Sequence, residues 1–165
     1  FHSDCFRAYI NDDLVGVQLC GVMKNVLAIA TGIADGLNMG SNAKAALITR
    51  GIAEMTRLCD AMDAQANTIM SLAGIGDVIL TCTDNQSRNR RFGLYLGQGK
   101  TIEQATQEIG QAIEGIKNVT QLKQLSDKHS VDMPITAEVY NLLQNQTTTT
   151  KMLQNLMGRK PRAER

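Results

Sequence analysis

Apolar residues recur along most of this chain at helical spacing, in segments separated by short polar or glycine-containing stretches. The longest segment runs from Val15 to Gly32 and is apolar or small on every side. This pattern predicts a helix buried on all faces that ends near Gly32 or Gly36. Ser41 and Asn42 then predict the N-cap of a second helix, because their side chains accept backbone hydrogen bonds.

Helical patterns continue after the second helix. A short helix is predicted around 67–73, followed by a tight turn over 74–77, where two glycines relax the backbone. Residues 78–83 are too short an apolar run to classify. Residues 84–87 predict a turn and N-cap for a helix that stops at Gly97 or Gly99. The remaining predictions are a capping box at 101–104, helices around 119–125, from Pro134 and over 152–157, and a solvated loop over 144–150.

The start of the chain differs from the rest, because Phe6–Ile10 has the composition of a short strand. A lone strand cannot satisfy its own backbone groups, so this one would need a sheet that the chain lacks. Together with a first residue that is not methionine, it suggests the back half of a longer protein. We predict a junction at 1–11, an all-α domain over 12–158 without internal repeats, and a disordered basic tail at 159–165.

Composition narrows the possible partners. The 165 residues are 43% hydrophobic and 20% charged with two prolines, which suits one helical domain with a real core. No tryptophan and a net charge of +1 give no argument for nucleic acid or a membrane. The four cysteines form no CxxC, so we expect buried free thiols and neither a disulfide nor a metal site. Without a signal peptide or an unbroken apolar run of spanning length, a cytoplasmic protein is expected.

Lys24 is the most informative single residue. It lies in the middle of the long apolar segment, and its helical neighbours at three and four positions offer no carboxylate. A lysine in such a place needs a partner from elsewhere in the fold or must give up its charge, and lysines of this kind are common among catalytic groups. The alternative is a lysine whose ammonium group reaches the helix surface.

Two further segments carry candidate chemistry. Asp77 follows the glycine pair and precedes an apolar run, so it could meet a buried cation or a hydroxyl group; the alternative is a helix N-cap. Ser87–Arg91 places three arginines at a helix start, which suits phosphate, although a solvated basic patch has the same composition. Helical spacing places Arg88 and Arg91 on one face and directs Arg90 elsewhere.

Several of these blocks occur together and in order. They are Lys24-Asn25-Val26 within the long segment, Ser41–Gly51, Ala73–Thr83, Asn85–Gly93, Ile113-Glu114-Gly115 and Met133–Thr136. In this combination the chain resembles the C-terminal domain of bacterial NAD(P)-dependent glycerol-3-phosphate dehydrogenases over nearly its whole length. The resemblance implies an all-α, multi-helix bundle of the 6-phosphogluconate-dehydrogenase C-terminal-like type. The family's glycine-rich Rossmann domain is not in this sequence, and the predicted strand matches the junction that follows it.

The resemblance implies roles for individual residues. Lys24 matches the catalytic acid/base that exchanges a proton with the carbonyl oxygen of dihydroxyacetone phosphate, and Asp77 matches a substrate-contacting aspartate beside it. The remaining matches are Ser87, Arg88 and Asn89 for glycerol phosphate, and Arg88, Ala112 and Glu114 for the cofactor. Relatives often carry valine at the position of Ala112, which matters little if only the main chain is used. No metal is implied.

The resemblance also implies partners. These are NAD or NADP, dihydroxyacetone phosphate or sn-glycerol 3-phosphate, the protein's own N-terminal Rossmann domain and a second copy in a homodimer. The reaction would supply glycerol 3-phosphate for phospholipid synthesis, and this chain alone is expected to be inactive. One alternative is a helical dimerisation or packing module without activity. Others are the 6-phosphogluconate and hydroxyisobutyrate dehydrogenase families, which the Asn85–Arg91 block argues against.

Overall fold

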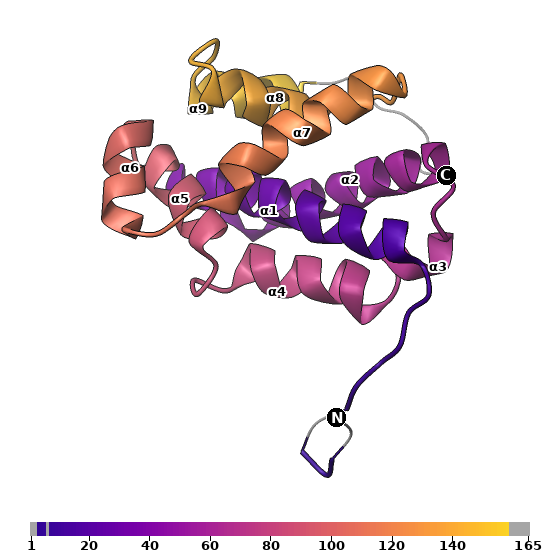
Figure 1. The fold of residues 1–165 in the computed structure, drawn as a ribbon. Coiled ribbons are helices and arrows are strands. Elements are labelled where there is room, and N and C mark those ends of the chain that lie inside the picture. The colour runs from indigo at the N-terminus through magenta and orange to yellow at the C-terminus, as the bar shows by residue number, and fades with distance from the viewer. Residues whose placement is uncertain (1–2, 6, 159–165) are drawn as a thin grey trace.

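One long helix, α1 (Leu14–Gly36), forms the centre of the computed structural model, which describes residues 3–5 and 7–158 (Figure 1). Its N-cap is Asp13, whose Oδ1 accepts a hydrogen bond from the Gly16 N–H at 2.9 Å. Helices α2, α4, α5, α7 and α8 all contact α1. The prediction of a helix buried on all faces is confirmed for residues 25–34, whereas the first half of α1 keeps Leu14, Val15 and Gln18 exposed.

The described part of the chain contains helices and no sheet, which confirms the predicted fold class. After α1 follow α2 (Gly40–Ala61), α3 (Ala66–Ile69), a π-helix η1 (Leu72–Gly76), α4 (Asp77–Thr83), α5 (Arg88–Gly97), α6 (Ile102–Ile109), α7 (Glu114–Lys128), α8 (Pro134–Leu143) and α9 (Thr149–Met157). Figure 1 shows α4 on one side of α1 and α7 to α9 on the other. The core therefore forms around α1, with Met23, Ile29 and Ile33 among its fully buried side chains.

Glycines set the position of α5 against α1. Gly32 and Gly36 are one turn apart on α1, and Gly93 and Gly97 are one turn apart on α5. A Cβ atom added at Gly32 would lie 2.1 Å from the Arg90 carbonyl oxygen, and one at Gly93 would lie 2.1 Å from the Ile29 carbonyl oxygen. The two backbones thus touch directly, and this close contact fixes where α5 begins relative to α1.

Most local signals in the sequence gave the correct element. Ser87 caps α5, which ends at Gly97, and Pro134 is the first residue of α8. Thr101 and Gln104 form the predicted capping box of α6. The unclassified run 78–83 belongs to α4. The predicted loop at 144–150 is shorter than expected, because Thr148 caps α9 and the helix begins at Thr149.

Several predictions were wrong. Helix α2 begins at Gly40 behind Met39, so Ser41 and Asn42 lie inside its first turn and do not cap it. Residues 74–76 continue a π-helix and do not form a tight turn. A Cβ atom at Gly74 would lie 2.1 Å from the Ile69 carbonyl oxygen, so close backbone packing explains that glycine. Cys20, Cys59 and Cys82 are buried free thiols as expected, but Cys5 is exposed.

The predicted N-terminal strand is not formed in the part that can be described. Arg7–Ile10 has no regular secondary structure and projects from the helical body (Figure 1), while Phe6 lies outside the described residues. Among residues 3–5 and 7–158 no strand lies beside this segment, so its backbone groups have no sheet to pair with. The tail at 159–165, predicted to be disordered, also lies outside the described residues.

Two stretches of the described chain are long and apolar enough to cross a membrane by length and composition alone, namely α1 and residues 66–83. The sequence pattern had predicted none. Helix α1 is 61% buried as the central core helix, and the core helix of a globular domain passes the same test. Residues 66–83 are divided between α3, η1 and α4 and are 28% buried. This evidence for a membrane span is weak.

Candidate functional site

Lys24 finds its partner across the fold. Its Nζ lies 2.5 Å from Oδ2 of Asp77, and the two side chains are 25% and 32% exposed. Lys24 is on α1 and Asp77 opens α4, so the packing of these two helices creates the pair. The alternative reading of Asp77 as an N-cap is wrong, because Gly76 holds the N-cap position. The Lys24 ammonium group reaches solvent, but the Asp77 carboxylate holds it in a fixed position at a partly buried surface.

Thr81 belongs to this pair, although sequence reasoning did not single it out. Its Oγ1 donates a hydrogen bond to Oδ1 of Asp77 at 3.1 Å, one helical turn along α4. Both carboxylate oxygens of Asp77 are therefore engaged, one by Lys24 and one by Thr81. The i,i+4 spacing of an aspartate and a threonine was the signal that could have found it.

A second charged group lies at the start of α5. Arg88 donates to Gln111 and Glu114, each at 3.4 Å, and the Arg88 and Glu114 side chains are 38% and 60% exposed. Ser87 caps the helix by accepting the Arg90 N–H at 3.2 Å. Within the described chain, the N–H groups of Arg88 and Asn89 have no acceptor. Two backbone donors without an acceptor in the described chain and a partly exposed guanidinium group thus lie together at a positive helix end.

A buried hydrogen-bond chain joins the two charged groups. Asn89 Nδ2 donates to Asn25 Oδ1 at 2.9 Å, and the Gly115 N–H donates to Asn89 Oδ1 at 2.9 Å. Asn25 and Asn89 are 5% and 7% exposed. Asn25, Asn89 and Gly115 directly follow Lys24, Arg88 and Glu114 in sequence. One chain of hydrogen bonds therefore joins the three helices that carry the charged residues. A buried polar network of this kind orients its neighbours when all its members are satisfied.

Gly115 has no room for a side chain at this junction. A Cβ atom there would lie 2.6 Å from Ile29 Cδ1, 2.8 Å from Asn89 Oδ1 and 3.2 Å from the Asn25 carbonyl oxygen. The start of α7 therefore touches α1 and α5 closely, which brings Glu114 to Arg88. Sequence reasoning noted the glycine but gave no reason for it, and it did not single out Asn25. A polar residue next to Lys24 inside an apolar helix was the available signal.

Arg90 has a different role from Arg88. It points away, as helical spacing predicted, but into the protein, where its side chain is 8% exposed. Its Nε donates to the Cys82 carbonyl oxygen at 3.0 Å, and its guanidinium group contacts Asp35 and Asn85. The arginines of Ser87–Arg91 therefore differ in role, because Arg90 is buried and structural whereas Arg88 is exposed. Neither a uniform solvated patch nor a uniform phosphate site describes them. Ala112 is exposed in the connection just before α7.

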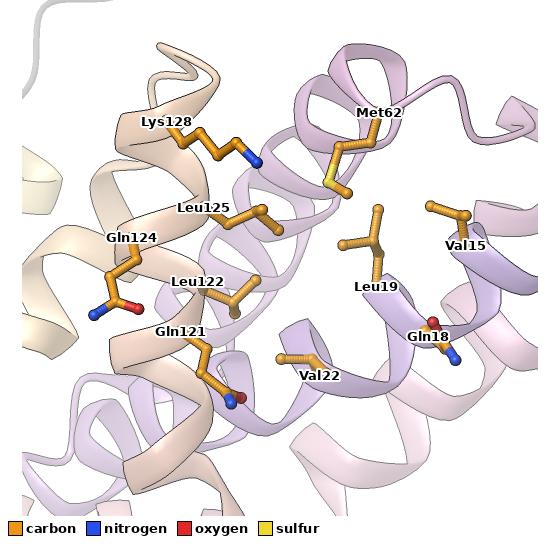
Figure 2. Close-up of a pocket in the computed structure, with 10 residues that line it drawn as sticks. All are labelled: Val15, Gln18, Leu19, Val22, Met62, Gln121, Leu122, Gln124, Leu125 and Lys128. Atoms are coloured by element: carbon orange, nitrogen blue, oxygen red, sulfur yellow. The ribbon is translucent and has the colours of Figure 1, made fainter.

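An apolar surface groove lies elsewhere along α1. It has a volume of about 510 Å³ between the first half of α1, the end of α2 and α7, and Leu19, Val22, Leu122 and Leu125 contribute to its apolar wall (Figure 2). None of the candidate catalytic or binding residues lines it. The candidate residues lie instead on α1, α4, α5 and α7, in the ion pairs Lys24–Asp77 and Arg88–Glu114.

Known proteins share this sequence and fold. A family model described as NAD-dependent glycerol-3-phosphate dehydrogenase C-terminus matches residues 13–154, so the chain belongs to that family of oxidoreductase domains. It is 54% identical over 163 residues, 99% of this chain, to glycerol-3-phosphate dehydrogenase [NAD(P)+] of Coxiella burnetii, and 53% identical over 164 residues to the enzyme of that name from Legionella pneumophila. It spans about half the length of both, 49% and 50%.

Solved structures agree with these relatives. A crystal structure of glycerol-3-phosphate dehydrogenase from Coxiella burnetii superimposes with a TM-score of 0.93 at 54% identity, covering 96% of this chain and 49% of that one. Glycerol-3-phosphate dehydrogenase from Saccharomyces cerevisiae gives a TM-score of 0.86 at 26% identity, covering 96% of this chain and 46% of that one. The arrangement of helices around α1 is therefore shared with full-length enzymes that have a further domain's length of chain.

Proposed function

We propose that this chain is the substrate-binding and catalytic C-terminal domain of a glycerol-3-phosphate dehydrogenase. The full-length protein would interconvert dihydroxyacetone phosphate and sn-glycerol 3-phosphate with NAD or NADP. The observation that carries the proposal is the Lys24–Asp77 ion pair at 2.5 Å, linked through Asn25 and Asn89 to the helix start that bears Arg88. It supports the proposal because this reaction needs a proton donor and a phosphate anchor held in one frame.

Lys24 supplies the proton in this proposal. When the ketone carbon is reduced, negative charge develops on its oxygen, and the ammonium group of Lys24 stabilises that charge and transfers one proton to it. In the reverse direction the amine accepts the proton of the secondary hydroxyl group. Asp77 holds Lys24 in place, and Thr81 holds Asp77. Fixing the donor in this way lowers the cost of ordering it during each turnover.

The start of α5 anchors the phosphate. Arg88 offers a charged, forked donor, and the N–H groups of Arg88 and Asn89 have no other acceptor within the described residues. The Asn89 side chain is committed to Asn25 and Gly115, so we assign its substrate contact to the backbone N–H. Ser87 caps the helix, and its hydroxyl group lies at the same end. A helix start with an arginine and unpaired N–H groups is well suited to bind a dianionic phosphate group.

The donor set at the edge of the site also fits a nicotinamide dinucleotide. Arg88 offers a cation for phosphate oxygens and Glu114 an exposed carboxylate for ribose hydroxyl groups, with the main chain at Ala112 beside it. The nicotinamide ring supplies the hydride when bound. Most of the cofactor's binding surface belongs to the N-terminal half that the relatives have in addition. We further propose a cytoplasmic homodimer whose product serves phospholipid synthesis.

Substitution of Lys24 in the full-length protein tests the proposal. Lys24→Ala should lower kcat for reduction of dihydroxyacetone phosphate by about 10²- to 10⁴-fold, the usual contribution of a positioned acid/base group. Lys24→Arg should also be poor, since a guanidinium group does not release its proton. Turnover is measured from NAD(P)H absorbance, with circular dichroism to confirm that the fold is retained.

Lys44→Ala is the matched control. Lys44 pairs with Asp35 at 3.0 Å, and these side chains are 23% and 18% exposed, so its removal breaks a similar lysine–aspartate pair away from the site. Normal turnover in Lys44→Ala together with strong loss in Lys24→Ala supports the proposal. Near-normal turnover in a folded Lys24→Ala enzyme would overturn it.

A further inference from the structure

The π-helix η1 (Leu72–Gly76) ends directly before Asp77, the partner of Lys24. π-Helices are rare and frequently occur at functional sites. The Asp77 N–H donates to the carbonyl oxygens of Leu72 and Gly74, so both of its backbone acceptors belong to η1. The π-helix therefore holds the backbone of the residue whose carboxylate holds Lys24.

A contact that only glycine permits sets the place of η1. A Cβ atom at Gly74 would lie 2.1 Å from the Ile69 carbonyl oxygen and 2.6 Å from the Thr68 carbonyl oxygen. Cβ atoms do not approach such atoms closer than 3.0 Å, so a side chain at this position would displace the backbone by about 1 Å. Because the Gly74 carbonyl oxygen accepts the Asp77 N–H, the displacement would carry Asp77 with it.

The segment before η1 is fixed to the helix that carries Lys24. Asp13, the N-cap of α1, accepts a hydrogen bond from Thr68 Oγ1 at 2.7 Å. The Thr68 carbonyl oxygen accepts from the Ser71 hydroxyl group at 2.6 Å, and the Ser71 carbonyl oxygen accepts from the Gly74 N–H at 3.2 Å. Asp13 and Thr68 are 7% and 3% exposed, so water competes little for these bonds. One chain of contacts thus runs from the start of α1 to η1.

We propose that η1 positions the Asp77 carboxylate for Lys24 and that Gly74 is the positioning residue, an inference that rests on the proposed function. Lys24 Nζ and Asp77 Oδ2 lie 2.5 Å apart, so a displacement of the start of α4 by about 1 Å would disturb this contact. A misplacement of about 1 Å can lower a catalytic rate by about a hundredfold, even when the altered residue is away from the chemistry. Gly74 acts on Lys24 only through Asp77.

Gly76 offers a matched control within the same π-helix. Neither Gly74 nor Gly76 has a positive φ angle, so the backbone conformation allows alanine at both positions. A Cβ atom at Gly76 would lie 3.1 Å from Leu72 Cδ2, and the Leu72 side chain is exposed and can rotate aside. Of the two glycines, only Gly74 meets backbone atoms closer than 3 Å. Alanine at both positions brings the same change in helix propensity but displaces Asp77 only at Gly74.

Kinetics of the full-length protein test the inference. Gly74→Ala should lower kcat for dihydroxyacetone phosphate reduction by about tenfold to a hundredfold, whereas Gly76→Ala should keep it within about twofold. A double-mutant cycle with Asp77→Asn separates positioning from general damage. Asp77→Asn removes the carboxylate that Gly74 positions, so adding Gly74→Ala should then cost less than about twofold more. Equal losses in both backgrounds, or equal losses in Gly74→Ala and Gly76→Ala, would overturn the proposal.

Ser71→Ala provides the same test if Gly74→Ala does not fold. It removes only the hydroxyl bond to the Thr68 carbonyl oxygen. Loss of one hydrogen bond in the frame should lower kcat by about threefold to tenfold when Asp77 is present. In the Asp77→Asn background the loss should be less than about twofold. Unchanged kcat in Ser71→Ala, or the same loss in both backgrounds, would then overturn the proposal.

Crystal structures of the full-length variants give a readout that needs no substrate. In Gly74→Ala the distance from Lys24 Nζ to Asp77 Oδ2 should lengthen by about 1 Å, and in Gly76→Ala it should stay near 2.5 Å. An unchanged distance in Gly74→Ala would overturn the inference, even if Lys24→Ala inactivates the enzyme and the proposed function stands. A lengthened distance, in a protein whose Lys24→Ala variant keeps near-normal turnover, would leave the positioning of Asp77 standing and remove the proposed function.

Discussion

Lys24 and Arg90 show how the same kind of residue, a cation in the core of a helical protein, reaches two different outcomes. Lys24 stays a quarter exposed beside Asp77, which comes from a helix 53 positions away in sequence. Arg90 is nearly buried and uses its donors on Asp35, Asn85 and a carbonyl oxygen. A cation with all its donors committed to the protein is structural, whereas one that keeps access to solvent can meet a ligand.

Arg88 leads to a prediction about substrate affinity. Arg88→Ala in the full-length protein should raise the KM for dihydroxyacetone phosphate by about tenfold to a hundredfold, because a charged hydrogen bond is worth roughly 1.5–3 kcal/mol. Arg88→Lys should recover part of the loss, since it keeps the charge and lacks the fork. Steady-state kinetics with varied substrate measure both.

The control for Arg88 follows from the contacts. Arg90→Ala is unsuitable, because it would leave the Asp35 carboxylate without its arginine and destabilise the fold. Arg50 is exposed on α2 and donates to the Leu156 carbonyl oxygen at 2.9 Å, away from all candidate residues. An equal rise in KM in Arg50→Ala would show that general positive charge, and not a specific anchor, attracts the substrate.

Glu54 gives a prediction about pH. It is 1% exposed on α2, and its carboxylate accepts hydrogen bonds from the Ile135 N–H at 2.5 Å and from the Thr136 N–H and Oγ1 at 3.2 Å. Burial raises the pKa of Glu54 from 4.5 to about 7, against the effect of those donors and of Arg57. The folded state therefore holds this proton up to a higher pH than the unfolded state.

The sign of the effect follows by linkage. Stability from Glu54 is fully present below pH 4.5 and is lost as pH rises towards 7, by on the order of 3 kcal/mol in the free energy of unfolding. Glu54→Gln, which does not titrate, should lack this part of the pH dependence. Urea denaturation of both proteins between pH 4.5 and 8 measures the difference. Parallel curves over that range would show that the three donors keep Glu54 ionised at every pH tested.

At the scale of whole elements, the sequence was most informative where the signal was local. The capping box at Thr101, the cap at Ser87 and Pro134 each mark a helix start by chemistry within one turn, and all three predictions were confirmed. The N-cap at Ser41 failed because Met39 and Gly40 turn the chain into α2 earlier. A polar residue in the first helical turn and one at the cap look alike in sequence.

Contacts between elements were beyond the sequence. Gly32, Gly36 and Gly97 were considered only as possible helix ends, and Gly93 was given no role. Gly32 and Gly93 lie inside helices, and all four glycines let α1 and α5 touch. Likewise the roles of Lys24 and Asp77 were proposed by resemblance, and spacing alone could not pair residues on two helices. Each of these facts depends on which helix faces which, and that is decided by the whole core.

The glycine contact predicts opposite effects for two glycines of the same helix. Gly32→Ala should lower the free energy of unfolding by about 1–3 kcal/mol, because its Cβ would meet the Arg90 carbonyl oxygen at 2.1 Å and the backbone would have to shift. Gly21→Ala on α1 meets nothing within 4 Å and should raise it by about 0.5–1 kcal/mol. Chemical denaturation of both variants checks this pair. Equal effects would mean that helix propensity, and not packing, dominates at both sites.

At the scale of the whole molecule, the proposed function assigns the proton donor and the phosphate anchor to this chain, together with only the edge of a cofactor site. Activity should therefore require the other half of the protein. We expect the purified 165-residue chain, folded by circular dichroism, to show no NAD(P)H oxidation with dihydroxyacetone phosphate, because a hydride donor bound only through Arg88 and Glu114 is poorly held. The same assay on the full-length protein should show turnover.

Mixing separately purified halves gives this prediction a second, sharper form. If the two halves associate without a covalent link, activity should return as the N-terminal half is added and should saturate, since association restores the geometry of the site. Full turnover by the 165-residue chain alone would show that these helices bind the cofactor unaided. The proposal that the helical half binds the substrate while the N-terminal half binds the hydride donor would then be wrong.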